Sequence, residues 1–258
     1  MNATIEVPSG GAWFDGHFPG RPILPGVAEL ALILEALARE ARRPVCIQGI
    51  AFARLRQLVF PGDRLDLEAR EQEASRLRID LKREGVLVAN AEFILGAPEV
   101  SRSDTTASMA STMQDAIFPQ LDELLPHRPP MRFLTSILHE AVDGLTCAAR
   151  IPGQCALVSG GGAQPVAAIE AAAQAAAAWE ALRRWREAGL AAPRIGYLVA
   201  LRDVVFFTGR VPADRDLLVS VSLEAAAPPL THYRIAVSLE GRLVTRGAIA
   251  TFLADDRA

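Results

Sequence analysis

GHFPGRPILPGVAELALILEALAR, residues 16–39, joins a loop rich in proline and glycine to an apolar helix. The three prolines restrict the loop backbone, which favours a fixed position for His17. The spacing of apolar residues predicts a helix over about 27–42. A lone histidine in a loop is more often structural than catalytic, so the residues around His17 have to decide its role.

The elements around this stretch occur twice along the chain. A short strand near the N-terminus precedes the loop, and four segments with alternating or continuous apolar residues follow the helix, as strands do. The second half has a strand around 145–151, an alanine-rich helix over 165–189 and four more strands. The predicted strands are 46–60, 64–73, 76–84 and 86–95 in the first half and 196–207, 215–225, 232–241 and 242–254 in the second.

The repeat predicts an α+β fold of two similar domains. In each domain, one central helix would be wrapped by an antiparallel sheet, and small residues on most helix faces would let helix and sheet approach closely. Residues 98–116 are polar and rich in Ser and Thr, which is typical of a linker. The predicted domains are therefore 1–97 and 117–258.

Composition excludes several classes of protein. The net charge is −3 with both signs interspersed, which argues against a nucleic-acid partner. No apolar run is long enough to span a membrane, and the N-terminal stretch has no signal-peptide pattern, so we expect a cytoplasmic protein. The sequence has no nucleotide-binding fingerprint and no zinc-type cysteine spacing, so we expect neither cofactor nor metal.

FDGHFPGRPILPGV, residues 14–27, resembles the active-site loop of the hotdog-fold 3-hydroxyacyl-[acyl-carrier-protein] dehydratases. LLPHRPPM (124–131) resembles their N-terminal signature, and IEAAAQAAA (169–177) resembles their central helix. The pairing is most similar to the two dehydratase-like proteins of aryl-polyene biosynthesis, joined in one chain. The resemblance implies a double hotdog that forms an intramolecular pseudo-dimer, with further oligomerisation left open.

The resemblance also implies a reaction and a partner. A 3-hydroxyacyl thioester on an acyl carrier protein would lose water to give the trans-2-enoyl thioester, as in fatty-acid or aryl-polyene biosynthesis, without a cofactor. Each site in this family takes its histidine from one hotdog and its acid from the other. Arg54 and Arg56, on the strand after the first helix, are candidates for contact with an acidic carrier protein.

The family's acid lies fourteen residues after the histidine, where this chain has Ala31. Aligning the halves by an offset of 139 pairs Ala31 with Glu170 and His17 with Ala156. The first half thus keeps the base and lacks the acid, and the second half has the reverse. We therefore predict one composite site, formed by His17 and Glu170.

These residues suit the elimination of water. A histidine that titrates near neutral pH can take the α-proton, and a carboxyl group among apolar side chains favours the protonated form that a general acid needs. The backbone N–H of Gly26, at the start of the first helix, is the family-implied donor to the thioester carbonyl. Gln174, one turn after Glu170, would orient that carboxyl group.

Several alternatives remain open at this point. Glu35, one turn beyond the family position, could be the acid instead, and Glu29 is interpreted as a partner of the helix dipole. His127 is interpreted as structural, and ALVSGGGAQ (156–164) as a flexible remnant or as room for substrate. The chain could also be a hotdog thioesterase that uses Glu170, a non-catalytic carrier-binding module, or a hydratase running the reaction in reverse.

Overall fold

The computed structural model describes residues 1–99, 118–189 and 193–253. Within these ranges, eleven strands form one antiparallel sheet in the order β1-β3-β4-β5-β2-β10-β14-β13-β12-β7-β6. The N-terminal half contributes β1 (Asn2–Glu6), β2 (Ile47–Leu55), β3 (Arg64–Gln72), β4 (Arg76–Arg83) and β5 (Val86–Leu95). The C-terminal half contributes β6 (Leu134–Ala141), β7 (Gly144–Ala149), β10 (Gly196–Phe206), β12 (Leu217–Ala227), β13 (Leu230–Leu239) and β14 (Arg242–Leu253).

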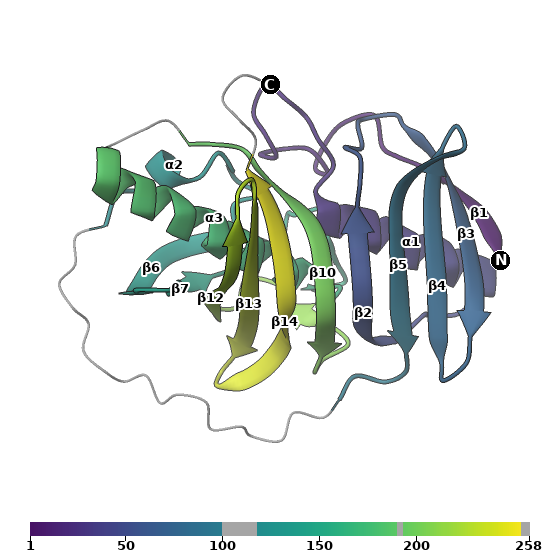
Figure 1. Cartoon of the computed structure of the whole chain (residues 1–258). Helices are drawn as coiled ribbons and strands as arrows, with labels where there is room; N and C mark the ends of the chain where they lie inside the picture. Colours follow the sequence, from purple (N-terminus) through teal and green to yellow (C-terminus); the bar gives the residue numbers. More distant parts are fainter. Residues whose placement is uncertain (100–117, 190–192, 254–258) are drawn as a thin grey trace.

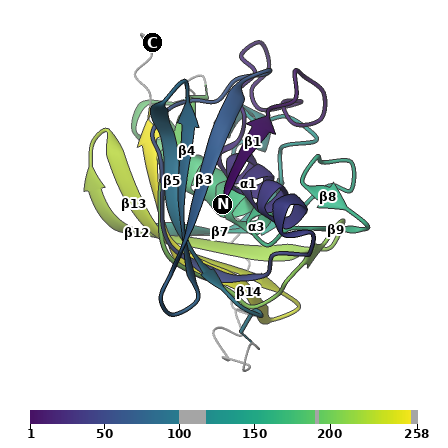
Figure 2. The same ribbon diagram turned by 90° about the vertical axis from the view of Figure 1, so that its right-hand side faces the viewer.

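Two long helices lie against this sheet, one in each half: α1 (Gly26–Ala41) and α3 (Ala167–Ala188). Figure 1 shows them pointing away from each other, with their N-terminal ends at the centre of the molecule. Figure 2 shows the sheet curving around both helices. Each half is therefore a hotdog, and the predicted α+β double-hotdog fold is confirmed.

The two hotdogs share one sheet because β2 pairs with β10. The register places Arg54 opposite Ala200 and Gly49 opposite Val205. A Cβ atom on Gly49 would overlap the carbonyl oxygen of Val204, so the close approach of the two strands requires glycine there. The pseudo-dimer is thus joined by backbone hydrogen bonds as well as by side-chain packing.

The alanines of α3 explain how this helix is buried on most of its surface. Thirteen of its residues are buried, and eight of these are alanine. Trp179 is the largest fully buried side chain and meets the Tyr233 ring edge-on at 5.9 Å between centroids. Small side chains on the remaining faces let the strands approach the helix backbone closely.

The structure differs from the sequence prediction in three places. Residues 156–164 are not a flexible remnant: β8 (Val158–Ser159) and β9 (Gly162–Ala163) form a hairpin that pairs with β11 (Val211–Pro212). Gly160 and Gly161 supply the positive φ angles of its turn. The structure also contains β6, whose burial does not alternate, and a short helix, α2 (Leu121–Leu124), neither of which was predicted.

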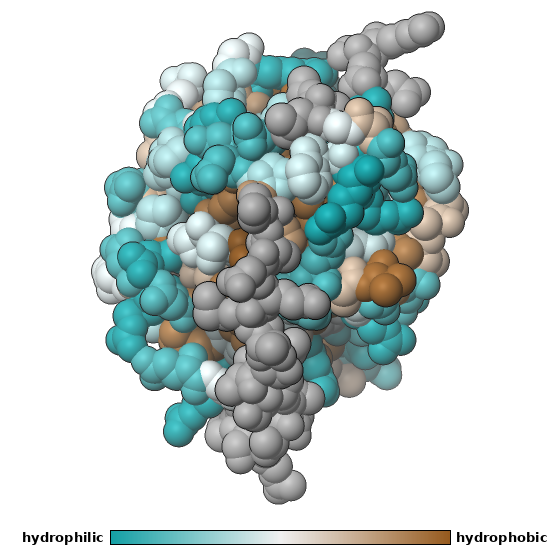
Figure 3. All heavy atoms as spheres, turned by 90° about the vertical axis from the view of Figure 1, so that its left-hand side faces the viewer, coloured by the Kyte–Doolittle hydropathy of each residue, from teal (hydrophilic) through white to brown (hydrophobic). Residues whose placement is uncertain are grey.

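The predicted linker over 98–116 lies almost entirely outside the described residues, so the domain boundaries stay a prediction. None of the helices in the described ranges is long and apolar enough to cross a membrane. On the outer face at the end of the C-terminal hotdog, hydrophilic side chains predominate and hydrophobic ones are scattered among them (Figure 3).

Candidate active site

The loop before α1 fixes the position of His17 and the tautomer of its neutral ring. The His17 N–H donates to the Phe14 carbonyl at 2.9 Å, and the Ile23 N–H donates to the His17 carbonyl at 3.2 Å. The ring nitrogen Nδ1 lies 2.9 Å from the Ile23 carbonyl oxygen. Because a carbonyl oxygen only accepts, this hydrogen bond requires the proton on Nδ1. Nε2 of neutral His17 then keeps its lone pair, as a general base requires.

Glu170 lies in the first turn of α3 and is 3% exposed. Gln174 Nε2 donates to Glu170 Oε1 at 3.0 Å and to the Met131 carbonyl at 2.7 Å. Gln174 Oε1 accepts from the Phe133 N–H at 2.8 Å. Both ends of the Gln174 amide are thus anchored to the backbone before β6, and the amide in turn fixes one oxygen of Glu170.

The two halves meet where the His17 loop packs on the segment that precedes β6. The Arg128 N–H donates to the Gly16 carbonyl at 2.9 Å. The rings of His17 and His127 lie 5.3 Å apart between centroids. One side-chain donor atom from each of His17, His127 and Glu170 lies within 4.8 Å of the others, and all three residues are buried. The structure therefore brings the predicted pair together across the junction.

His127 is the third member of this cluster, which the sequence analysis did not expect. Its Nε2 lies 3.5 Å from Glu170 Oε1. Burial, and then the nearby His17 and Arg128, hold the pKa of His127 well below its usual range. The imidazole is therefore neutral at physiological pH, and its contact with Glu170 is not an ion pair. The signature LPHRPP carries His127, but nothing in it indicates that the segment folds over the other domain's loop.

Histidine nitrogens and carboxylate oxygens are also ligands that zinc binds in proteins. Among the described residues, these three are the group that could hold a metal ion. No metal was expected from the sequence, and elimination of water by a base and an acid requires none.

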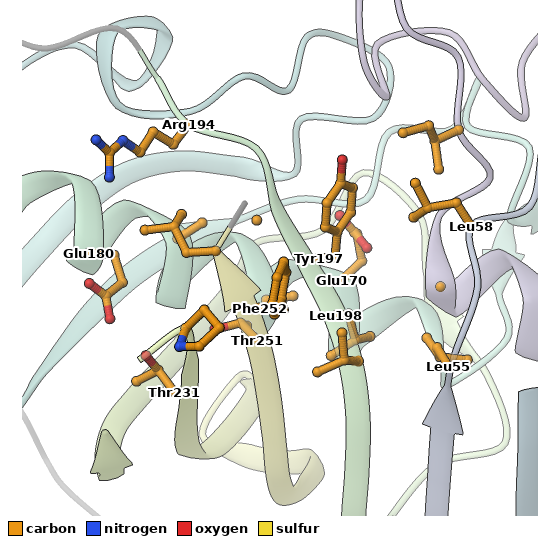
Figure 4. Close-up of a pocket in the computed structure, with 18 of the residues that line it drawn as sticks. Leu55, Leu58, Glu170, Glu180, Arg194, Tyr197, Leu198, Thr231, Thr251 and Phe252 are labelled. Carbon is orange, nitrogen blue, oxygen red and sulfur yellow. The ribbon is translucent and has the colours of Figure 1, made fainter. Parts of the chain in front are cut away.

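A pocket of about 960 Å³ opens around the cluster. His17, Gly26, His127 and Glu170 all line it, whereas Glu35 is exposed and does not. Both Glu170 and Tyr197 line the pocket, and Figure 4 shows Leu55 and Leu58 on the side of the N-terminal hotdog and Glu180, Arg194 and Thr231 on the other. The alternative acid, Glu35, therefore has no access to this pocket.

Glu29 lies in the first turn of α1, as predicted, but it is also buried in the pocket. It is 4% exposed and lines the pocket, whereas the sequence analysis described it only as a partner of the helix dipole. Desolvation by burial raises the pKa of Glu29 well above its usual range, and the charge of Arg83 opposes this only in part. A sequence signal did exist, since Glu29 lies one turn from Gly26 on the same helix face.

Replacing Gln174 by leucine is expected to lower the free energy of unfolding by roughly 1–3 kcal/mol. The change would leave the Phe133 N–H and the Met131 carbonyl without their partner in a buried environment. Urea denaturation measures the effect. Gln164→Leu is the matched control, because Gln164 Oε1 is buried with no hydrogen-bond partner among the described residues. Equal losses in the two variants would contradict the anchoring role of Gln174.

Comparison with known proteins gives two family matches in tandem. Residues 119–258 match the family described as ApeP-like, ApeP dehydratase. Residues 1–92 match the family described as ApeI-like, ApeI dehydratase.

Curated relatives match part of the chain. The 3-hydroxyacyl-[acyl-carrier-protein] dehydratase FabZ of Myxococcus xanthus is 42% identical over an alignment of 80 residues, and the match covers 26% of this chain and 47% of the relative. The FabZ of Anaeromyxobacter sp. is 38% identical over an alignment of 100 residues, and the match covers 32% of this chain and 62% of the relative. The chain thus spans between about half and under two thirds of the length of these relatives.

Solved structures show the likeness of the fold. The dehydratase domain of the polyketide PpsC from Mycobacterium tuberculosis has a TM-score of 0.71 at 15% identity, covering 99% of this chain and 93% of that one. The dehydratase heterocomplex ApeI:P from Xenorhabdus doucetiae has a TM-score of 0.50 at 20% identity, covering 54% of this chain and 94% of that one. The likeness to the PpsC dehydratase domain extends over both hotdogs.

Proposed function

Because the chain belongs to the ApeP-like dehydratase family and carries an ApeI-like dehydratase match in its first half, we propose that it dehydrates a 3-hydroxyacyl thioester to the trans-2-enoyl thioester. One observation carries the proposal. His17 and Glu170 come from opposite halves of the chain and lie buried within 4.8 Å of each other in one pocket. Each chain would have one active site for this reaction, at the composite site.

His17 acts as the general base in this proposal. Its Nε2 takes the proton from C2 of the acyl chain, and the Ile23 carbonyl stabilises the resulting imidazolium through Nδ1–H. The electron pair of the broken C2–H bond forms the C2–C3 double bond.

Glu170 acts as the general acid. Its protonated carboxyl group donates to the 3-hydroxyl as the C3–O bond breaks, so the leaving group departs as water. His17 ends with one proton more and Glu170 with one fewer, and a return of that proton through solvent restores the site. Gln174 is a positioning residue, because its amide fixes the Glu170 oxygen that it contacts.

Gly26 supplies a backbone N–H donor for the thioester oxygen. It is the first residue of α1 and lines the pocket, and the N–H of a first helical residue has no acceptor within its helix. This N–H would donate to the thioester oxygen as negative charge develops there.

We further propose an acyl carrier protein as the partner that presents the substrate. Arg56, Arg183, Arg184 and Arg194 line the pocket and give part of its wall a positive charge, which suits an acidic carrier and its phosphate-linked arm. The aryl-polyene or fatty-acid setting and the cytoplasmic location belong to the same proposal.

The thioesterase alternative uses Glu170 alone and gives His17 no role. The geometry favours the dehydratase because His17 is held in the tautomer that a base requires, at the distance where both groups reach one substrate. A non-catalytic carrier-binding module would not need two buried polar groups drawn from opposite halves.

The test supplies the protein with 3-hydroxyacyl carrier protein and follows the products by mass. We expect loss of 18 Da from the acyl group and formation of the 2-enoyl thioester. The variant that carries both His17→Ala and Glu170→Gln is the control and should leave the substrate unchanged. Release of free 3-hydroxy acid would instead support the thioesterase, and an unchanged substrate with the wild type would support the non-catalytic module.

A further inference from the structure

Glu29 is a buried carboxyl group for which the proposed reaction has no use. One of its oxygens, Oε2, has no hydrogen-bond partner among the described residues. Its neighbour Arg83 donates instead to Asp63 at 2.6 Å, to Gln57 at 3.1 Å and to the Leu58 carbonyl at 3.3 Å. A buried polar group without a partner costs free energy, so it calls for an explanation.

The position of Glu29 offers an explanation for its missing partner, because Glu29 lines the same pocket as His17 and Glu170. Burial raises its pKa, so the carboxyl group is protonated over a wider range of pH and can both donate and accept a hydrogen bond. A ligand in the pocket could therefore complete its hydrogen bonding.

The helix sets the distance from Glu29 to the thioester site. Gly26 and Glu29 lie three residues apart, which is about 4.5 Å of rise on one helix face. Side chains on a helix lean toward its N-terminus, which brings the Glu29 carboxyl group alongside the turn that begins at Gly26. The partner of Glu29 should then be a polar group within a few bonds of the thioester carbonyl.

Two polar groups of the substrate meet this condition. The first is the 3-hydroxyl, which the reaction assigns to Glu170. The second is the amide of the pantetheine arm nearest to the sulfur, two methylene groups away from it. Every substrate on a carrier protein or on coenzyme A has this amide.

We propose that Glu29 is a binding residue that forms a hydrogen bond with the amide of the pantetheine arm nearest to the thioester sulfur. This inference rests on the proposed function for the place of the thioester carbonyl. It assigns to the first hotdog, besides the base, the recognition of the arm that carries the acyl chain.

The test compares two substrates of equal length. One is the 3-hydroxyacyl N-acetylcysteamine thioester, which has the amide, and the other is the S-pentyl thioester, which lacks it. For the wild type, we expect kcat/KM to be on the order of tenfold higher with the amide, the value of one well-made buried hydrogen bond. Glu29→Leu should bring this ratio close to one by lowering kcat/KM for the amide substrate alone. Glu29→Gln should keep most of the wild-type ratio.

Glu35→Leu is the matched control, since Glu35 lies on the same helix but is exposed and outside the pocket. It should keep the wild-type ratio. A merely structural role of Glu29 would lower kcat/KM equally for both substrates in Glu29→Leu, and this result would overturn the inference. A wild-type ratio that persists in Glu29→Leu would do the same.

Binding of saturated acyl analogues, which cannot lose water, separates this inference from the proposed function. Calorimetry with the N-acetylcysteamine and S-pentyl analogues should give the same tenfold preference in the wild type and none in Glu29→Leu. If the wild type formed no enoyl product but bound with this pattern, the proposed reaction would be wrong and the role of Glu29 would stand. Equal binding of the two analogues by the wild type would overturn the role of Glu29.

Discussion

Glu170→Gln is expected to lower the turnover of 3-hydroxyacyl thioester by a factor on the order of 100 or more, the usual contribution of a general acid. Glutamine keeps the size of the side chain and a hydrogen-bonding oxygen that Gln174 can contact. It cannot transfer a proton to the leaving hydroxyl. The loss should therefore appear in kcat, while the fold remains intact by thermal unfolding.

His17→Ala should cause a loss of similar size, because the two groups act in the same step. Combining both changes should cost far less than the product of the single losses, since residues that act as a unit are not additive. Glu35→Gln is the control on the same kind of side chain and should remain close to wild type, because Glu35 is exposed and outside the pocket. If Glu35→Gln were inactive and Glu170→Gln active, the acid would belong to the first half.

Mixing the two single variants tests where the pair forms. If His17 and Glu170 of one chain make the site, each variant chain lacks one of the two groups and the mixture stays inactive. Recovery of activity in the mixture would mean that hotdogs pair between chains.

Gly16→Ala is expected to impair both stability and turnover, because Gly16 is the point where the His17 loop meets the second half. Gly16 has a φ of +84°, and a Cβ atom there would lie far inside van der Waals contact with the Arg128 carbonyl. The backbone strain alone is worth about 1–2 kcal/mol for alanine. The clash should also break the hydrogen bond from the Arg128 N–H to the Gly16 carbonyl and displace His17 from Glu170.

Gly20→Ala is the matched control in the same loop. Gly20 has a φ of +77°, but a Cβ atom there would meet nothing within 4 Å. Gly20→Ala should therefore carry the backbone cost alone and keep its activity, whereas Gly16→Ala should lose at least tenfold in turnover. Urea denaturation and the dehydration assay measure the two effects. Equal behaviour of the two variants would show that the contact with Arg128 does not position His17.

The features that depend on local pattern could be predicted from the sequence. The helix expected over 27–42 is α1 (Gly26–Ala41), and the helix expected over 165–189 contains α3 (Ala167–Ala188). The offset of 139 pointed to Glu170 because it pairs this residue with Ala31, the position where the family has its acid, although α3 (Ala167–Ala188) begins later in this alignment than α1 (Gly26–Ala41) does. The proposed partnership of His17 with Glu170 needed only this internal comparison and the family's geometry.

The features that depend on contacts between distant segments could not be predicted in this way. His127 enters the site because its segment packs on Gly16, and no periodicity reports that contact. Glu29 lies in the first turn of α1, as expected, but its burial and its place in the pocket depend on packing between segments far apart in the chain. The glycine-rich segment 156–164 became ordered through pairing of β9 with β11, about fifty residues further along the chain.

The two hotdogs that pair through β2 and β10 belong to one chain, which gives the molecule a property that separate hotdogs would not have. His17 and Glu170, the proposed catalytic pair, are parts of one covalent chain, so their encounter does not depend on how much protein is present. In thermodynamic terms, the second hotdog is always at a high effective concentration around the first. Dilution that dissociates a two-chain complex would leave this site assembled, and each copy of the chain carries base and acid in a fixed one-to-one ratio.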